Sequence, residues 1–180
     1  MNYYHIYLSA LFFASLLFLI TGIAVLMFPG RSPEKMEKLP RAVLPGVFIA
    51  ACDLAWCIPH SEPIAPVWMI NWLIPIALVA LWLSYQFLDY IFSRALGGLM
   101  ILSAHFFLYA SFSFHAPIKP FFSVLCYVMG LTGIFFCGKP HLMRDLIRKI
   151  IGDTLWKYSI AALLFVYFLV FLGIGVSYVI

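Results

Sequence analysis

Long runs of apolar residues, each about as long as a membrane-crossing helix, dominate this sequence. The clearest runs are Ile6 to Phe28 near the start and Leu155 to Ile180 at the end. A helix needs about 20 mainly apolar residues to cross the hydrocarbon core of a bilayer. Apolar residues form 65% of the chain and charged residues only 10%, so a soluble fold would expose extensive apolar surface. We therefore predict an all-α, polytopic integral membrane helical bundle.

Six spans are predicted in a single transmembrane domain that covers residues 1–180. They lie at about 6–28, 42–58, 64–88, 95–114, 121–137 and 155–180. The segment before the first span, Met1 to His5, has no Lys or Arg, which favours a retained helix over a cleaved signal peptide. Pro45 and Asp53 interrupt the second span, and a tight turn is expected from Pro59. Pro75 is expected to kink the third span.

Basic residues gather in alternate connections and thereby predict the orientation of the chain. The connections after spans one, three and five, with the start of span six, contain ten of the eleven basic residues: Arg31, Lys35, Lys38, Arg41, Arg94, Lys139, Arg144, Arg148, Lys149 and Lys157. The opposite side has only Lys119. Because cytoplasmic connections are enriched in Lys and Arg, we expect both termini on the non-cytoplasmic side of a bacterial inner (cytoplasmic) membrane. A five-span chain would lose this asymmetry.

Residues 140–151 are expected to form a cytoplasmic amphipathic helix. One face combines the apolar residues Leu142, Met143, Leu146, Ile147, Ile150 and Ile151, which recur at helical spacing. A basic amphipathic helix beside a span typically lies in the headgroup plane. Contact with anionic lipid headgroups is therefore predicted for Lys139, Arg144, Arg148 and Lys149. The alternative is a helix that docks on the bundle or on a partner subunit.

Three polar residues are expected near the middle of the membrane. Helical rise places Asp53 about 18 Å and His105 about 16 Å from the cytoplasmic edge of the membrane, and Asn71 about 13 Å from the outer edge. Acidic residues within spanning helices normally face the bundle interior and have partners. We therefore hypothesise an Asp53–His105 contact with Asn71 nearby, suited to a proton relay or a ligand site. The alternative is a purely structural tie between three helices.

Neither a metal site nor a cofactor is predicted. Asp53, Cys57 and His60 share one helix face, but Asp53 and His60 are about 10 Å apart along the axis. Metal ligands must converge within about 2–2.3 Å of the ion, which one straight helix cannot achieve. Haem is a minor alternative, because His5, His60 and His115 fall near helix ends rather than within spans.

Small residues at short spacing offer points of close helix approach. Examples are Ala10 with Ala14, Ala51 with Ala55, the Gly97-Gly98 pair, and Gly130 with Gly133. Such patterns arise frequently by chance in apolar helices, so on sequence grounds they carry little weight.

The expected function is that of a non-enzymatic integral membrane subunit that anchors or organises a membrane protein complex. Its expected partners are the lipid bilayer and other membrane subunits or further copies of the chain, and not nucleic acid. One alternative is a small proton, ion or solute transporter that uses the Asp53/His105 site. A weaker one is a lipid-modifying enzyme at the same depth. The sequence has no G-x-S-x-G, H-E-x-x-H or phosphate-cradling glycine loop.

Overall fold

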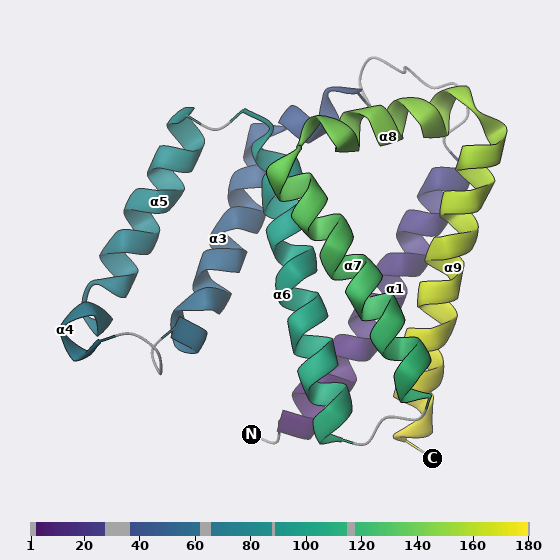
Figure 1. Cartoon of the computed structure of the whole chain (residues 1–180), viewed down its shortest axis with the longest axis horizontal. Coiled ribbons are helices and arrows are strands. Elements are labelled where there is room, and N and C mark those ends of the chain that lie inside the picture. The colour runs from purple at the N-terminus through teal and green to yellow at the C-terminus, as the bar shows by residue number, and fades with distance from the viewer. Residues whose placement is uncertain (1–2, 28–36, 62–65, 88, 115–117, 180) are drawn as a thin grey trace. The chain divides into compact units, whose positions relative to one another are not determined.

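The computed structural model describes residues 3–27, 37–61, 66–87, 89–114 and 118–179, and all of their regular secondary structure is helical (Figure 1). The elements are α1 (Tyr3–Met27), the 3₁₀ turn η1 (Leu39–Arg41), α3 (Val43–Ser61), α4 (Val67–Ile70), α5 (Leu73–Phe87), α6 (Ile91–Ser113), α7 (Lys119–Gly138), α8 (His141–Gly152) and α9 (Thr154–Ser177). The predicted all-α fold class is therefore confirmed.

Four of these helices, α1, α6, α7 and α9, are long and apolar enough to cross a membrane. They contain 25, 23, 20 and 24 residues respectively, which at about 1.5 Å per residue matches a hydrocarbon core of roughly 30 Å. Large apolar side chains such as Phe13, Ile134 and Leu169 are exposed on their surfaces. The chain is therefore a membrane protein, as its composition predicted.

The second predicted span is a continuous helix, α3, despite its prolines. Pro45 falls in the first turn of α3, where a backbone N–H has no intrahelical acceptor and proline is tolerated. The helix also continues through Pro59 and ends at Ser61. The tight turn predicted from Pro59 is therefore wrong for residues 59–61, because these residues are helical. The rest of the predicted turn, residues 62–63, lies outside the described part of the chain.

The third predicted span is not one helix. The short α4 is followed by a turn at Asn71 and Trp72, and α5 then begins at Leu73. The break lies where Pro75 requires it, because proline cannot donate to the carbonyl four residues earlier, that of Asn71, and its ring clashes with that group. The kink expected at Pro75 is instead an interruption that shortens the helix to 15 residues.

The chain forms two compact units, which we describe separately. Unit 1 contains residues 1–36, 104–128 and 145–180, and unit 2 contains residues 37–103 and 129–144. Helices α6 and α7 therefore each contribute one half to each unit.

In unit 1, α1 and α9 pack antiparallel, so that both termini lie at the same end of the unit (Figure 1). Phe171 of α9 is fully buried at the centre of an aromatic cluster. Its ring centroid lies 4.9 Å from that of Phe107, 5.0 Å from Phe122 and 5.3 Å from Phe18. Aromatic packing therefore joins parts of α1, α6, α7 and α9.

Tyrosine hydroxyl groups connect the same helices through hydrogen bonds. Tyr4 donates to the Tyr178 carbonyl at 2.7 Å, and Tyr178 donates to the Phe114 carbonyl at 3.1 Å. Tyr167 donates to the Leu125 carbonyl of α7 at 2.7 Å. The Phe114 carbonyl follows the end of α6, where no intrahelical donor is available. Each hydroxyl thus satisfies a polar backbone group and ties two helices together.

In unit 2, glycines bring three helices into close contact. A Cβ placed on Gly97 of α6 would lie 2.6 Å from the Gly133 carbonyl oxygen of α7. A Cβ on Gly46 of α3 would lie 2.7 Å from the Phe92 backbone nitrogen of α6. These separations are far below ordinary contact distances, so the backbones approach as closely as they do because no side chain intervenes. The weakly weighted glycine pattern thus marks a real helix crossing.

Candidate functional site

Asp53 is the central residue of the candidate intramembrane site. It lies near the middle of α3 with 9% of its surface exposed. Its carboxyl group faces α6, since a Cβ on Gly98 would lie 3.0 Å from Asp53 Oδ2. Gly97 faces α7 and Gly98 faces α3, so the glycine pair allows both neighbours to approach α6. The absence of a side chain at Gly98 makes the space that the Asp53 carboxyl group occupies.

One oxygen of this carboxyl group is buried without a hydrogen-bond partner. Oδ1 of Asp53 is inaccessible to solvent, and no donor within the described ranges reaches it. Leaving a buried acceptor unsatisfied costs about 1–3 kcal/mol, and more if the group is charged. Buried polar groups in native proteins almost always have partners, so this oxygen marks Asp53 as a place where a proton or another group is expected.

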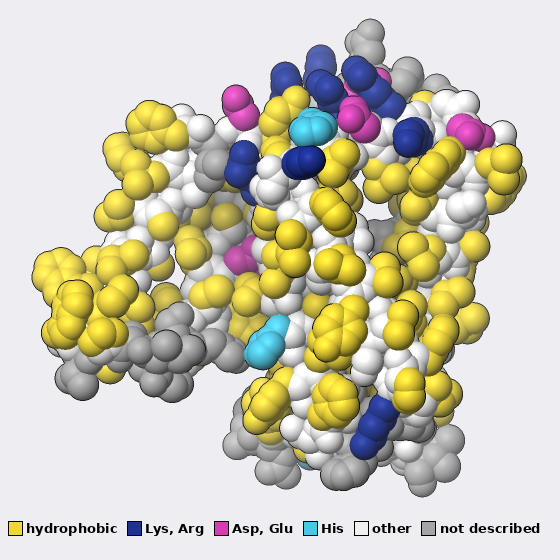
Figure 2. Space-filling view, in the orientation of Figure 1, with side chains coloured by type: hydrophobic (Ala, Val, Ile, Leu, Met, Phe, Trp, Pro, Cys, Tyr) yellow, Lys and Arg dark blue, Asp and Glu magenta, His cyan; other side chains and the backbone are white. Residues whose placement is uncertain are grey.

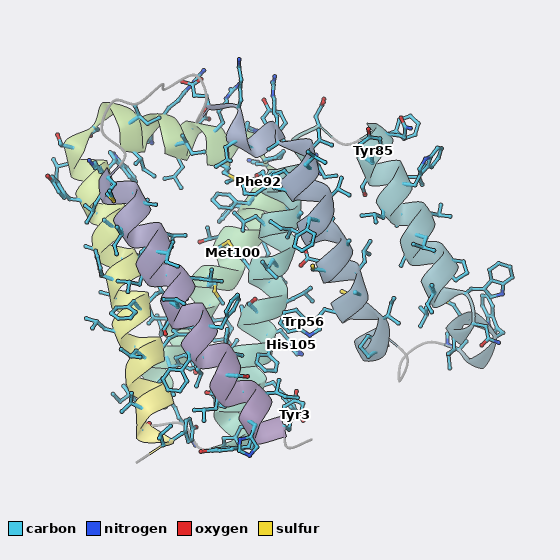
Figure 3. All side chains as sticks on the ribbon, turned by 180° about the vertical axis from the view of Figure 1, so that it is seen from behind. Tyr3, Trp56, Tyr85, Phe92, Met100 and His105 are labelled. Atoms are coloured by element: carbon cyan, nitrogen blue, oxygen red, sulfur yellow. The ribbon has the colours of Figure 1, made fainter. Side chains whose placement is uncertain are left out.

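His105, the predicted partner of Asp53, lies on α6 in unit 1 (Figure 3). Its side chain is exposed, and its ring stacks near that of Tyr109 with a centroid separation of 6.4 Å. Along α6, His105 comes seven residues after Gly98, which corresponds to about two helical turns. Because Asp53 and His105 belong to different units, their contact stays a prediction.

Asn71, the third predicted member, follows α4 in the turn that precedes α5. Its side chain is exposed. Of the three polar residues that the sequence singled out, Asp53 is therefore the one whose side chain is buried.

Metal-ligating side chains do not gather in the part of the chain that the structure describes. Within it, no group of three His, Cys, Asp or Glu side chains is close enough to hold an ion. The four cysteines are free thiols. The side chain of His60, which belonged to the metal alternative considered above, lies outside the described residues. His115, which was named with the haem alternative, lies outside them too.

The basic segment folds as α8, one residue later at each end than predicted. Figure 2 shows Lys and Arg side chains gathered along this helix. Arg148 and Lys149 are exposed, and Met143 is buried. The ammonium group of Lys149 lies 4.8 Å from the ring centroid of Trp156, at the start of α9. Asp153 caps α9 by accepting a hydrogen bond from the Leu155 amide at 2.9 Å.

Sequence reasoning missed a cluster of arginines around Tyr90. Arg41 donates a hydrogen bond to the Tyr90 hydroxyl group at 2.6 Å, and Arg144 donates to the same oxygen at 3.5 Å. All three residues belong to unit 2. Arg41 served above only as a marker of orientation, and Arg144 served as such a marker and as a predicted contact for lipid headgroups. No sequence signal pairs them, because about a hundred residues separate them and Tyr90 lies in a connection without a motif.

The fold defines an all-helical membrane protein. None of the protein-family models, characterised proteins or solved structures compared with this chain matches it. Its function is therefore argued from the geometry of its own residues.

Proposed function

We propose that this chain is a non-enzymatic integral membrane subunit that anchors or organises a membrane protein complex. The observation that supports this most directly is the exposure of the side chains of α5. This helix packs along α3 in unit 2 (Figure 1), yet none of its side chains is buried. Its surface away from α3 includes the exposed residues Ile76, Val79 and Leu83.

The packing between α3 and α5 is itself loose. A groove of about 140 Å³ runs between the two helices and is lined by small and aliphatic side chains. Those on α3 are Ala51, Leu54, Ala55 and Ile58, and those on α5 are Ile74, Ala77, Leu78 and Leu81. A helix that packs this loosely on its neighbour gains little from tertiary packing, so α5 is suited to further contacts.

The length of α5 favours a protein partner over lipid alone. Its 15 residues extend about 22 Å, which is shorter than a hydrocarbon core of roughly 30 Å. A short hydrophobic helix relieves this mismatch by thinning the bilayer, by extending its flanking side chains or by oligomerising. A partner helix against Val79 and Leu83 would both cover apolar surface and reduce the mismatch between the length of α5 and the thickness of the bilayer.

The proposed topology has six crossings, with α3 and α5 as the two short ones and α8 on the cytoplasmic surface. It follows from the charge pattern of the connections. Both termini are then on the non-cytoplasmic side, and the basic face of α8 meets anionic lipid. The membrane proposed for it is a bacterial inner membrane.

Copurification in mild detergent tests the proposed function. The tagged chain is extracted from its native membrane, and Leu83→Trp is compared with Leu16→Trp, which alters an exposed position of α1. We expect a stoichiometric partner or a second copy that Leu83→Trp removes and Leu16→Trp retains. Recovery of wild-type chain as a monomer, with neither a partner nor a second copy, would contradict the proposal.

A second candidate function is proton, ion or solute transport through the Asp53 site. The observation in its favour is the buried, unpartnered Oδ1 atom of Asp53, because ionisable groups within spans frequently mark ion and proton pathways. Flux into liposomes that Asp53→Asn abolishes would support this function. A lipid-modifying enzyme has no specific observation in its favour.

A further inference from the structure

Two arginine side chains that are distant in sequence meet at one phenol oxygen in unit 2. The hydroxyl oxygen of Tyr90 accepts a hydrogen bond from Arg41 Nη2 at 2.6 Å and another from Arg144 Nη1 at 3.5 Å. The guanidinium carbon of Arg41 also lies 4.6 Å from the centroid of the Tyr90 ring. Tyr90 therefore fixes the position of Arg41 both through its ring and through its hydroxyl group.

This arrangement concentrates positive charge around a neutral group. Arginine stays protonated at any physiological pH, and two guanidinium groups that share one acceptor repel each other. Arg94 adds a third cation one helical turn after Tyr90, and its Nε atom is buried without a hydrogen-bond partner among the described residues. Two guanidinium groups therefore meet at the Tyr90 oxygen, and Arg94 adds a buried N–H donor that no acceptor in the described part of the chain uses.

The backbone holds Tyr90 in an uncommon conformation. Its φ is 60°, a left-handed value that side-chain-bearing residues rarely adopt and that persists only where surrounding structure enforces it. The Phe92 amide at the start of α6 is not open to an anion, because Gly46 packs directly on its nitrogen. The donors that meet at the Tyr90 oxygen are those of side chains.

We propose that Arg41, Tyr90 and Arg144 form a binding site for a phosphate oxyanion. A guanidinium group presents two parallel N–H donors, and these match the spacing of two phosphate oxygens. The Tyr90 hydroxyl accepts from both arginines and keeps its own proton, which it can donate to the ligand. Arg41 is exposed, so a ligand can reach the cluster.

The phosphate can belong to a lipid headgroup or be free in solution. A lipid source rests on the proposed topology, in which η1, the start of α6 and α8 all lie at the cytoplasmic headgroup level. A soluble phosphate requires no such placement. Both sources share the chemistry of a phosphate group that meets two guanidinium forks and a phenol.

The test measures thermal unfolding of the full chain in a zwitterionic or neutral detergent during two titrations. One titration adds phosphatidic acid and the other adds inorganic phosphate, at constant ionic strength. The variants are Tyr90→Phe, which removes only the hydroxyl group, and Arg41→Lys, which keeps the charge but loses the paired N–H donors of the guanidinium group. Lys38→Gln is the control, since it removes an exposed charge next to η1 at a residue that has no part in the proposed site.

We expect saturable stabilisation of the wild-type chain in at least one titration. Its apparent affinity should fall about tenfold in Tyr90→Phe and in Arg41→Lys, as loss of a hydrogen bond to a charged group implies, and less than twofold in Lys38→Gln. Stabilisation by phosphatidic acid alone assigns the site to a headgroup, and stabilisation by both probes assigns it to phosphate in general. Equal weakening in Lys38→Gln, or wild-type affinity in both site variants, would overturn the proposal. Neither result bears on copurification, so the proposed function is tested independently.

Discussion

The backbones of Gly97 in α6 and Gly133 in α7 are in direct contact. A Cβ on either residue would lie 2.6 Å from the carbonyl oxygen of the other. Real Cβ atoms do not approach a backbone oxygen so closely, and neither backbone can move without displacing its helix. This crossing places Gly98, the next residue, against Asp53 of α3. The geometry around Asp53 therefore depends on the glycine contact.

Gly133→Ala is expected to destabilise the protein by about 1–3 kcal/mol, because the added methyl group must push α6 and α7 apart. A lower midpoint of thermal unfolding in detergent, measured by tryptophan fluorescence, would show this. Gly97→Ala should behave in the same way, since its methyl group meets the same crossing from the other side.

Gly173→Ala provides the matched control for that prediction. Gly173 is also within a long helix, α9, but nothing lies within 4 Å of the position of its Cβ. The substitution should be neutral or stabilise the chain by up to about 1 kcal/mol, since alanine favours helix more than glycine does. A loss of stability at Gly173 equal to that at Gly133 would contradict the proposed crossing.

Tyr167→Phe is expected to cost about 0.6–1 kcal/mol. The Tyr167 hydroxyl group is in the core of unit 1 and donates to the Leu125 carbonyl of α7 at 2.7 Å. Hydrogen bonds between membrane helices contribute about this much on average, and the phenylalanine ring preserves the packing. Tyr158→Phe is the control, because Tyr158 is 61% exposed. Equal midpoints for both variants would exclude a contribution from the bond.

Asp53→Asn is expected to leave thermal stability unchanged or raise it slightly. The reason is that Oδ1 of Asp53 has no partner among the described residues, so the wild-type side chain bears a desolvation penalty that asparagine reduces. If Asp53 serves transport, proton flux into liposomes should fall while the chain stays folded. A loss of more than about 2 kcal/mol would instead identify Asp53 as one half of a hydrogen-bonded tie.

The predicted contact between Asp53 and His105 is testable by a double-mutant cycle. Thermal stability is measured for Asp53→Asn, His105→Gln and the double variant. A contact implies a coupling energy of at least about 0.5 kcal/mol, whereas residues more than 7–10 Å apart with no shared partners give additive effects. Additivity within error would remove His105 from the candidate site.

The long helices were predictable because the lengths of apolar runs determine them. The spans predicted at 6–28, 95–114, 121–137 and 155–180 correspond to α1, α6, α7 and α9 with shifts of a few residues at their ends. The division of the third span was less predictable. Pro75 signals a disruption, but whether it kinks a helix or ends it depends on the neighbours that satisfy the freed carbonyl.

The candidate sites were predictable only in part. An acid within an apolar span is conspicuous, so Asp53 was identified from its position alone. Gly98 was named only as a point of close helix approach and not as the neighbour of Asp53, because composition does not indicate which face of α6 meets α3. The cluster of Arg41, Tyr90 and Arg144 arises from a long-range contact, and nothing in the sequence pairs residues so far apart.

The most direct test of the central claim, a six-span membrane protein with basic connections in the cytoplasm, is the accessibility of single cysteines. Cys52, Cys57, Cys126 and Cys137 are first replaced by serine or alanine, and Lys38→Cys, Lys149→Cys and Lys119→Cys are then introduced one at a time. A membrane-impermeant maleimide should label Lys119→Cys in intact cells, but Lys38→Cys and Lys149→Cys only after permeabilisation. Labelling of Lys38→Cys and Lys149→Cys from opposite sides of the membrane would contradict this topology.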